Sequence, residues 1–118
     1  MTIAISIKNG NNVQTSYVHN LGIEDFDLFN MLHEKYNNKE AAEKIVNRGY
    51  YSFVRDFEKN FKLLNKKPVN HTSIHSLIND INFMEVETFV IYDADEAKWK
   101  VVQPYFGITT PTDLTKLL

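Results

Sequence analysis

Hydrophobic and polar residues alternate at the start of the chain. Ile3, Ile5 and Ile7 are separated by smaller or polar residues, and this period of two predicts a strand with one buried face. Residues 9–12 contain only Asn and Gly, which tolerate positive φ and favour a turn. Residues 13–19 are expected to return as a second strand. The first predicted unit is therefore a β-hairpin.

Beyond position 23 the apolar spacing changes to three and four residues, which indicates helices. The first predicted helix has acidic residues in its first turn, where the helix dipole favours negative charge, and it ends near Tyr36. Asn37 or Asn38 can cap a second, short helix. Gly49 suits the left-handed position that follows the last turn of that helix.

Two more helices are predicted in the middle of the chain. Aromatic residues spaced by three and four between positions 50 and 61 favour a third helix, although their density also permits a strand at its start. Residues 62–69 contain a pair of lysines followed by a proline and are expected to form a loop. His71 or Thr72 then precedes a fourth amphipathic helix, which covers residues 74–81.

The last third of the chain again predicts strands. Residues 86–92 and 99–103 are rich in β-branched and aromatic side chains and flank a polar segment at 93–97, so they are expected to form a second hairpin. Further on, Thr110 is a suitable N-cap and Pro111 a suitable first helical residue. A last short helix is expected to begin there.

Two hairpins thus bracket a helical middle, without alternation of strands and helices. This order is typical of α+β proteins, in which helices lie on one side of an antiparallel sheet. We expect both hairpins to share one sheet because an isolated two-stranded ribbon is marginally stable in water. The sequence predicts a single α+β domain over residues 1–118, with an antiparallel sheet of two hairpins and the helices packed on one face.

Composition narrows the class of protein. The chain has 118 residues, of which 43% are hydrophobic, and this suffices for one core. The absence of cysteine excludes disulfides and fits a reducing compartment. Without a signal peptide or a run of about 18 apolar residues, a cytoplasmic protein without membrane contact is expected. The net charge of −2 disfavours direct nucleic-acid binding.

Two sequence patterns resemble metal sites but fail in detail. His71 and His75 stand four residues apart, but no third ligand follows at a useful spacing. Asp93 and Asp95 begin like a calcium loop, but alanine and lysine stand where a third oxygen ligand and an obligatory glycine belong. The four glycines are too dispersed for a phosphate-binding loop. We therefore expect neither a metal nor a cofactor.

Two other groups could serve catalysis. Glu96 and Lys98 resemble part of the acidic and lysine set of metal-dependent nucleases, but they fall in a predicted solvated turn rather than on a central strand. His19 lies near acidic residues of the first helix and could transfer protons, yet no nucleophile or second base accompanies it. We predict no catalytic residues, and an enzyme with few sequence signals is kept as an alternative.

Charged and aromatic residues form the predicted partner-binding set. A basic stripe and an acidic hairpin tip could steer a partner, although a merely solvated surface has the same composition. Aromatic residues near the C-terminus could anchor a partner, whereas core packing is the alternative for Trp99. The set consists of Arg55, Lys59, Lys62, Lys66 and Lys67 in the stripe, Asp93, Asp95 and Glu96 at the tip, and Trp99, Tyr105 and Phe106.

The C-terminal tail could also form a homodimer. Residues 104–108 and the leucines at 114, 117 and 118 are mostly apolar. Such a tail packs either on its own sheet or on a second copy of the chain.

Four groups of residues follow one another in a specific order along the chain. They are Tyr17, His19 and Gly22; Leu32, Tyr36, Asn37 and Glu40; Gly49 and Ser52; and the segments 90–92 and 98–101. In this order they resemble the motifs of small proteins encoded by bacteriophages and other mobile elements of Gram-positive bacteria. The first motif of that family is similar to Tyr-x-His-Trp-Asp-Gly-Tyr-Pro, from which residues 20–21 and 23–24 depart here.

The resemblance implies a protein that acts in the cytoplasm of a bacterial host and lacks an established enzymatic activity. The expected function is to bind and inhibit a host defence protein, in the first place a CRISPR effector nuclease. An immunity protein that neutralises a toxin domain is the alternative. In both cases the partner is a protein, and charged patches of both signs would steer the encounter.

Overall fold

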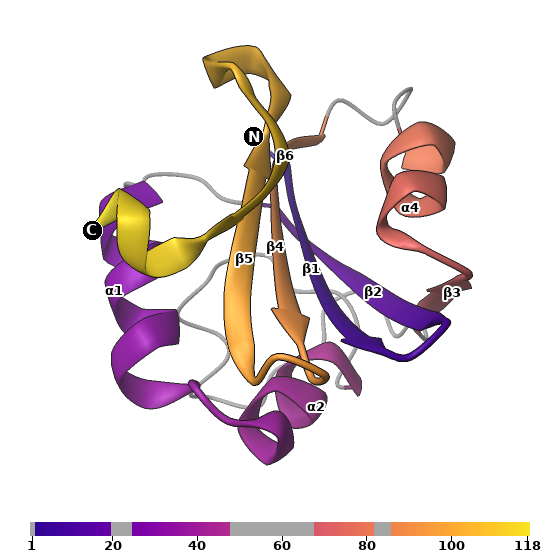
Figure 1. The fold of residues 1–118 in the computed structure, drawn as a ribbon, viewed down its shortest axis with the longest axis horizontal. Coiled ribbons are helices and arrows are strands. Elements are labelled where there is room, and N and C mark those ends of the chain that lie inside the picture. Colours follow the sequence, from indigo (N-terminus) through magenta and orange to yellow (C-terminus); the bar gives the residue numbers. More distant parts are fainter. Residues whose placement is uncertain (1, 20–24, 48–67, 82–85) are drawn as a thin grey trace.

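The computed structural model describes residues 2–19, 25–47, 68–81 and 86–118. These residues form a six-stranded sheet with the strand order β3-β2-β1-β4-β5-β6 (Figure 1). The pairs β1–β2 and β4–β5 are antiparallel hairpins, as the sequence predicts. The strands are β1 (Thr2–Asn9), β2 (Asn12–His19), β3 (Val69–His71), β4 (Val86–Asp93), β5 (Lys98–Gln103) and β6 (Ile108–Asp113).

The sheet is mixed, so the prediction of an antiparallel sheet made of two hairpins was wrong. The hairpins meet through their first strands, β1 and β4, which run parallel with Ile5 opposite Val90. A parallel pair needs a long crossing connection, and Ile5 and Val90 are 85 residues apart in the sequence. The residue pattern of the strands identifies each hairpin but carries no information about which of its edges meets another hairpin.

Helices cover both faces of the sheet, whereas one helical face was predicted (Figure 1). On one face, α1 (Asp25–Lys35) and α2 (Lys39–Asn47) bury their apolar side chains against the isoleucines of β1. On the other face, α4 (Ile74–Ile81) packs through Leu77, in a cluster that includes Ala4. Both faces of β1 are therefore buried, because its smaller residues lie under α4.

The helix boundaries follow from side-chain caps. The Asn38 side-chain oxygen accepts a hydrogen bond from the backbone N–H of Ala41 at 2.8 Å, which confirms one of the two predicted caps of α2. At α4 the cap is Ser73, whose hydroxyl oxygen accepts from the N–H of Ser76 at 3.0 Å. His71 and Thr72 precede this helix, as the sequence predicts, and His71 belongs to β3. The predicted third helix lies outside the described residues.

The C-terminal segment differs from its prediction. Residues 108–113 form β6, which pairs with β5, and a short 3-10 helix follows at Leu114–Leu117. Thr110 and Pro111 therefore belong to a strand instead of starting a helix. Proline has no backbone N–H, and an edge strand can accept it where that N–H would point away from the neighbouring strand. Pro111 is therefore compatible with an edge strand as well as with a helix start. Leu114 is buried in the core on the side of the sheet that α1 covers.

Within the described part of the chain, every helix is too short or too polar to span a bilayer.

Candidate partner-binding surface

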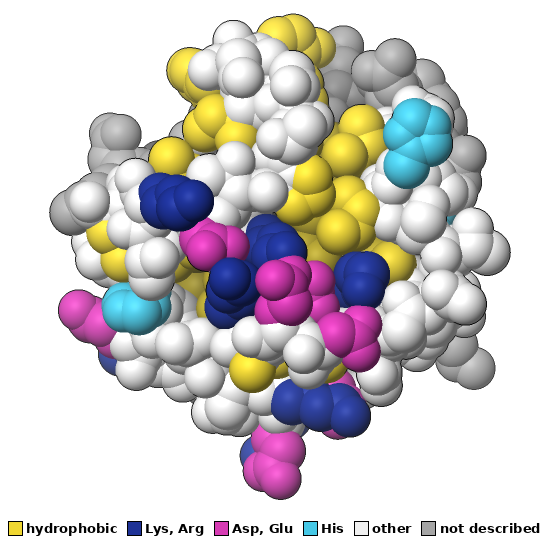
Figure 2. Space-filling view, viewed as in Figure 1, with side chains coloured by type: hydrophobic (Ala, Val, Ile, Leu, Met, Phe, Trp, Pro, Cys, Tyr) yellow, Lys and Arg dark blue, Asp and Glu magenta, His cyan; other side chains and the backbone are white. Residues whose placement is uncertain are grey.

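Side chains of both charges gather on one face of the sheet beside α4, and we call this group the ionic cluster (Figure 2). Three lysines and four carboxylates pair here across β1, β4, β5 and β6. Lys8 lies 2.9 Å from Asp95, and Lys98 lies 3.1 Å from Asp113. The ionic cluster consists of Lys8, Asp93, Asp95, Glu96, Lys98, Lys100 and Asp113.

Asp93 holds the β4–β5 turn together instead of presenting a free charge. Its carboxylate accepts hydrogen bonds from the backbone N–H groups of Asp95 and Glu96, at 3.0 and 3.2 Å. The same carboxylate lies 3.6 Å from the Lys100 ammonium and 3.9 Å from that of Lys8. Only 4% of Asp93 is exposed. Of the predicted acidic tip, Asp95 and Glu96 alone are accessible to a partner.

The ionic cluster joins the turns of the two hairpins. The Asp95 carboxylate accepts a hydrogen bond from the Lys8 ammonium and another, at 3.1 Å, from the backbone N–H of Gly10. These bonds lower the pKa of Asp95 and raise the pKa of Lys8, because each group is held beside its partner in the charged form. At the other end, the hydrogen bond from Lys98 lowers the pKa of Asp113.

Trp99 is a core residue in this structure. It is 3% exposed, and its indole N–H donates to the backbone oxygen of Tyr36 at 3.0 Å. Its ring meets that of Tyr92 edge to face, with centroids 5.4 Å apart. The arrangement matches the core-packing alternative for Trp99 and leaves little of the side chain for a partner.

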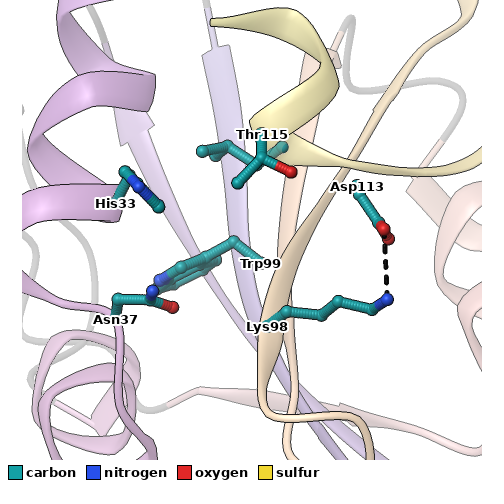
Figure 3. A pocket seen from close by; sticks show the side chains of 7 residues that line it. His33, Asn37, Lys98, Trp99, Asp113 and Thr115 are labelled. Atoms are coloured by element: carbon teal, nitrogen blue, oxygen red, sulfur yellow. Dashed lines mark hydrogen bonds and ion pairs between the residues drawn. The ribbon is translucent and has the colours of Figure 1, made fainter.

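A small cavity of about 60 Å³ lies beside Trp99. Figure 3 shows His33 of α1 and Asn37 on one side of the indole, and the paired Lys98 and Asp113 on the other. About 10–15 Å³ of such space holds one water molecule, so the cavity has room for only a few waters. The cavity is therefore too small for a metabolite or a peptide side chain.

The exposed aromatic pair forms the part of the predicted set that stands out from the surface. A short 3-10 helix at Pro104–Phe106 interrupts the path from β5 to β6. It is closed by Gly107, which has a φ of 80° and whose N–H donates to the Pro104 oxygen at 3.1 Å. Tyr105 is 75% exposed and Phe106 is 65% exposed. We call this segment, residues 104–107, the aromatic projection.

A groove of about 250 Å³ runs beside the aromatic projection, between it, α4 and β4. In Figure 2 hydrophobic side chains occupy the hollow between the projection at the top and α4 at the right. The residues that line the groove are Ile78, Val86, Phe89, Pro104 and Tyr105. All five of these described residues are apolar or aromatic.

Part of the predicted set lies outside the described residues, and part of the observed surface was not predicted. The basic stripe at Arg55, Lys59, Lys62, Lys66 and Lys67 lies outside the described residues, as does the side chain of His19. In contrast, the sequence did not predict the groove, Lys8 or Lys100, and it pointed to Lys98 only as part of a possible nuclease set. The groove residues come from a helix, a strand and a turn, and Lys8 is 85 residues or more from its carboxylate partners. Only the tertiary fold brings such residues together.

Among the described residues, no three His, Asp or Glu side chains gather in a way that could hold a metal ion. Comparison of the chain with protein-family models, with curated proteins and with solved structures finds no match.

Proposed function

We propose that this chain acts by binding another protein, with the aromatic projection as its anchor. The observation that supports this proposal is the exposure of two adjacent aromatic side chains, Tyr105 and Phe106, on a turn fixed by Gly107. Aromatic residues with small conformational freedom are enriched at the energetic centres of protein interfaces. A backbone turn already held in its bound conformation reduces the entropy lost when a partner covers the pair.

The area of the aromatic pair is large enough to matter for binding. A large aromatic side chain carries roughly 200 Å², so the exposed parts of Tyr105 and Phe106 amount to roughly 280 Å². At about 25 cal/mol per Å², removing this area from water contributes roughly 7 kcal/mol before the costs of association. Association costs about 4–15 kcal/mol, so the pair can anchor an interface but the surrounding contacts must supply most of the net affinity of a micromolar complex.

The ionic cluster supplies the polar rim of the proposed interface. It lies on the same face as the groove in Figure 2, and its exposed carboxylates Asp95 and Glu96 are held in place by lysines. Fixed charges of both signs around an apolar anchor are the usual anatomy of a specific, non-obligate interface. They select a complementary surface and raise the rate of encounter.

The resemblance to proteins of phages and mobile elements gives the class of partner. It favours a host defence protein, and a CRISPR effector nuclease is the first candidate. A secreted toxin's nuclease or other catalytic domain is the second candidate, since an immunity protein would use the same kind of surface. The resemblance supports both, and the aromatic projection supports protein binding in general.

The test uses the purified chain against a panel of CRISPR effector nucleases and a panel of toxin catalytic domains. We expect one member to form a complex and to lose its activity, measured by interferometry and by cleavage of target DNA. Phe106→Lys should weaken that complex at least tenfold, because it places a charge in the buried centre of the interface. The control Leu118→Ser removes another exposed apolar side chain and should leave binding unchanged.

Absence of a complex with every member of both panels would overturn the proposed partner class. Equal effects of Phe106→Lys and Leu118→Ser on a complex that does form would overturn the proposed anchor.

A further inference from the structure

The tip of the first hairpin carries the dipeptide Asn9-Gly10, which occurs once in the chain. Asn9 is the last residue of β1 and pairs with Asn12, so Gly10 and Asn11 form a two-residue turn. Gly10 has a φ of 62°, which such a turn requires at its first central position and which glycine adopts without strain. Both Asn9 and Gly10 are exposed, so water reaches the side-chain amide of Asn9.

An asparagine followed by glycine is chemically labile, because glycine has no side chain that keeps its backbone nitrogen away from the asparagine amide. In deamidation the Gly10 nitrogen would lose its proton and attack the side-chain carbonyl carbon of Asn9. A C–N bond forms there, the C–N bond of the side-chain amide breaks, and ammonia leaves. Water then opens the five-membered imide ring at either of its carbonyl carbons, which gives aspartate or isoaspartate. Water is the only other reactant.

A hydrogen bond to the second hairpin holds the Gly10 nitrogen away from this reaction. The Gly10 N–H donates to the Asp95 carboxylate at 3.1 Å. A charged acceptor binds an N–H more strongly than a neutral one, and its negative charge disfavours the anion that the nitrogen must form before it attacks. Asp95 also accepts from Lys8 at 2.9 Å, and the bonds from Lys8 and Gly10 lower the pKa of Asp95, so its carboxyl group stays charged at neutral pH.

The backbone of Asn9 adds a second restraint. In the imide ring, the Gly10 nitrogen and Cβ of Asn9 lie on the same side of the Cα–C bond of Asn9. Extended strand backbone turns that nitrogen away from Cβ, and the pairing of Asn9 with Asn12 holds Asn9 in the strand. The reaction therefore requires that the turn change its conformation and that Gly10 leave Asp95.

We propose that Asn9 is a latent deamidation site, which the hydrogen bond between Gly10 and Asp95 keeps closed. Asp95 stands 85 residues from Gly10 in the sequence, so the site is protected by the tertiary contact between the turns of the two hairpins. The rate of deamidation then reports how often that contact breaks. The reaction needs no foreign protein, so the inference goes beyond the proposed function and does not depend on it.

Deamidation would also weaken the contact that protects the site. Aspartate at position 9 places a second negative charge beside the residue that binds Asp95, and like charges repel. Isoaspartate in addition lengthens the main chain by a methylene group next to a turn of only two residues, where loop length fixes the strand register. Chains that have reacted should therefore open more easily than the original chain.

The experiment follows deamidation of the full chain over time at physiological temperature and pH. Trypsin cleaves after Lys8, and mass spectrometry of the peptide that begins at Asn9 detects the replacement of the amide by an acid. Fragmentation of the peptide separates Asn9 from Asn11 and Asn12. We expect Asp95→Ala to deamidate at Asn9 roughly three to ten times faster than the wild type, because an exposed charge-assisted hydrogen bond is lost.

Asp113→Ala is the matched control. It removes another carboxylate of the ionic cluster, which binds Lys98 instead of Gly10, and it should keep the wild-type rate. In urea, where the chains are unfolded, all three proteins should react at one common and faster rate. Circular dichroism melting checks that the variants fold, and the comparison of folded with unfolded wild type tests the protection without any substitution.

A folded wild type that reacts as fast as the unfolded chain would overturn the proposal. An Asp95→Ala rate equal to that of the wild type or of Asp113→Ala would overturn the role of the Gly10–Asp95 bond. An Asp95→Ala rate below that of the wild type would overturn it as well, since it would show that the carboxylate assists the attack as a base.

Discussion

At the scale of single residues, buried hydroxyl groups are paired across the sheet. Ser6 and Thr15 lie opposite each other on β1 and β2, and their hydroxyl oxygens are 2.7 Å apart with both residues fully buried. The Ser16 hydroxyl on the opposite face donates to the backbone oxygen of Val46 in the last turn of α2. These bonds satisfy polar groups that burial would otherwise leave without partners, and the second bond ties a helix end to the sheet.

The pair of Ser6 and Thr15 predicts a coupled effect on stability. Ser6→Ala alone leaves the Thr15 hydroxyl without this partner and should cost roughly 1–3 kcal/mol of unfolding free energy, and Thr15→Val alone should cost a similar amount. The double variant should cost clearly less than the sum, because it replaces both members of the pair by apolar groups. Urea unfolding of the four proteins measures this. Additive costs would show that the two hydroxyls act independently.

At the scale of elements, the sequence predicts local structure well and the joining of elements poorly. The first hairpin follows from alternation and turn residues, and the second follows from β-branched and aromatic runs that flank a polar turn. The start of α2 follows from Asn38. The parallel contact of β1 with β4 was missed, because the residues that face each other, such as Ile5 and Val90, would suit either edge of either hairpin.

The two edge strands were missed for a different reason. β3 has only three residues, which is too few for a period of two to be recognised. β6 contains Pro111 after Thr110, a pair that suits a helix start as well as a strand edge. For the candidate surface, sequence reasoning found Tyr105 and Phe106 as aromatic residues, but their exposure and the groove beside them depend on the tertiary fold.

The cap of α2 gives a prediction at this scale. Asn38→Ala removes the side-chain oxygen that accepts from the Ala41 N–H, so it should destabilise the protein by about 1 kcal/mol and lower its Tm by roughly 4 °C. The neighbouring variant Asn37→Ala removes the same side chain one residue earlier, where it does not cap the helix, and should stay within about 0.5 kcal/mol of the wild type. Thermal unfolding followed by circular dichroism compares them, and equal losses would show that the cap contributes nothing specific.

At the scale of the whole molecule, the ionic cluster connects segments from the two ends of the chain. Lys8 and Gly10 belong to the first hairpin and bind Asp95 in the turn of the second, while Lys98 on β5 binds Asp113 at the end of β6. The parallel strands β1 and β4 bring the two turns to the same end of the sheet. The cluster therefore reinforces the contact between hairpins that makes the sheet mixed, and at the same time it fixes the charges that we propose as the rim of the binding surface.

The lowered pKa values of Asp95 and Asp113 predict how acid affects this arrangement. A carboxyl group whose pKa is lower in the folded than in the unfolded protein stabilises the fold above its unfolded pKa, which is about 3.9 for aspartate. This contribution is lost as pH falls through the folded pKa. The free energy of unfolding should thus decrease as pH falls below about 4. Asp95→Asn should show a smaller decrease, because the amide cannot be protonated over that range.

Glu34→Gln removes a carboxylate from the exposed surface of α1 and serves as the control that keeps the wild-type response. Urea unfolding at neutral and acid pH measures each slope, and an Asp95→Asn slope equal to that of the wild type would mean that the bonds to Lys8 and Gly10 do not hold the two hairpins together in solution.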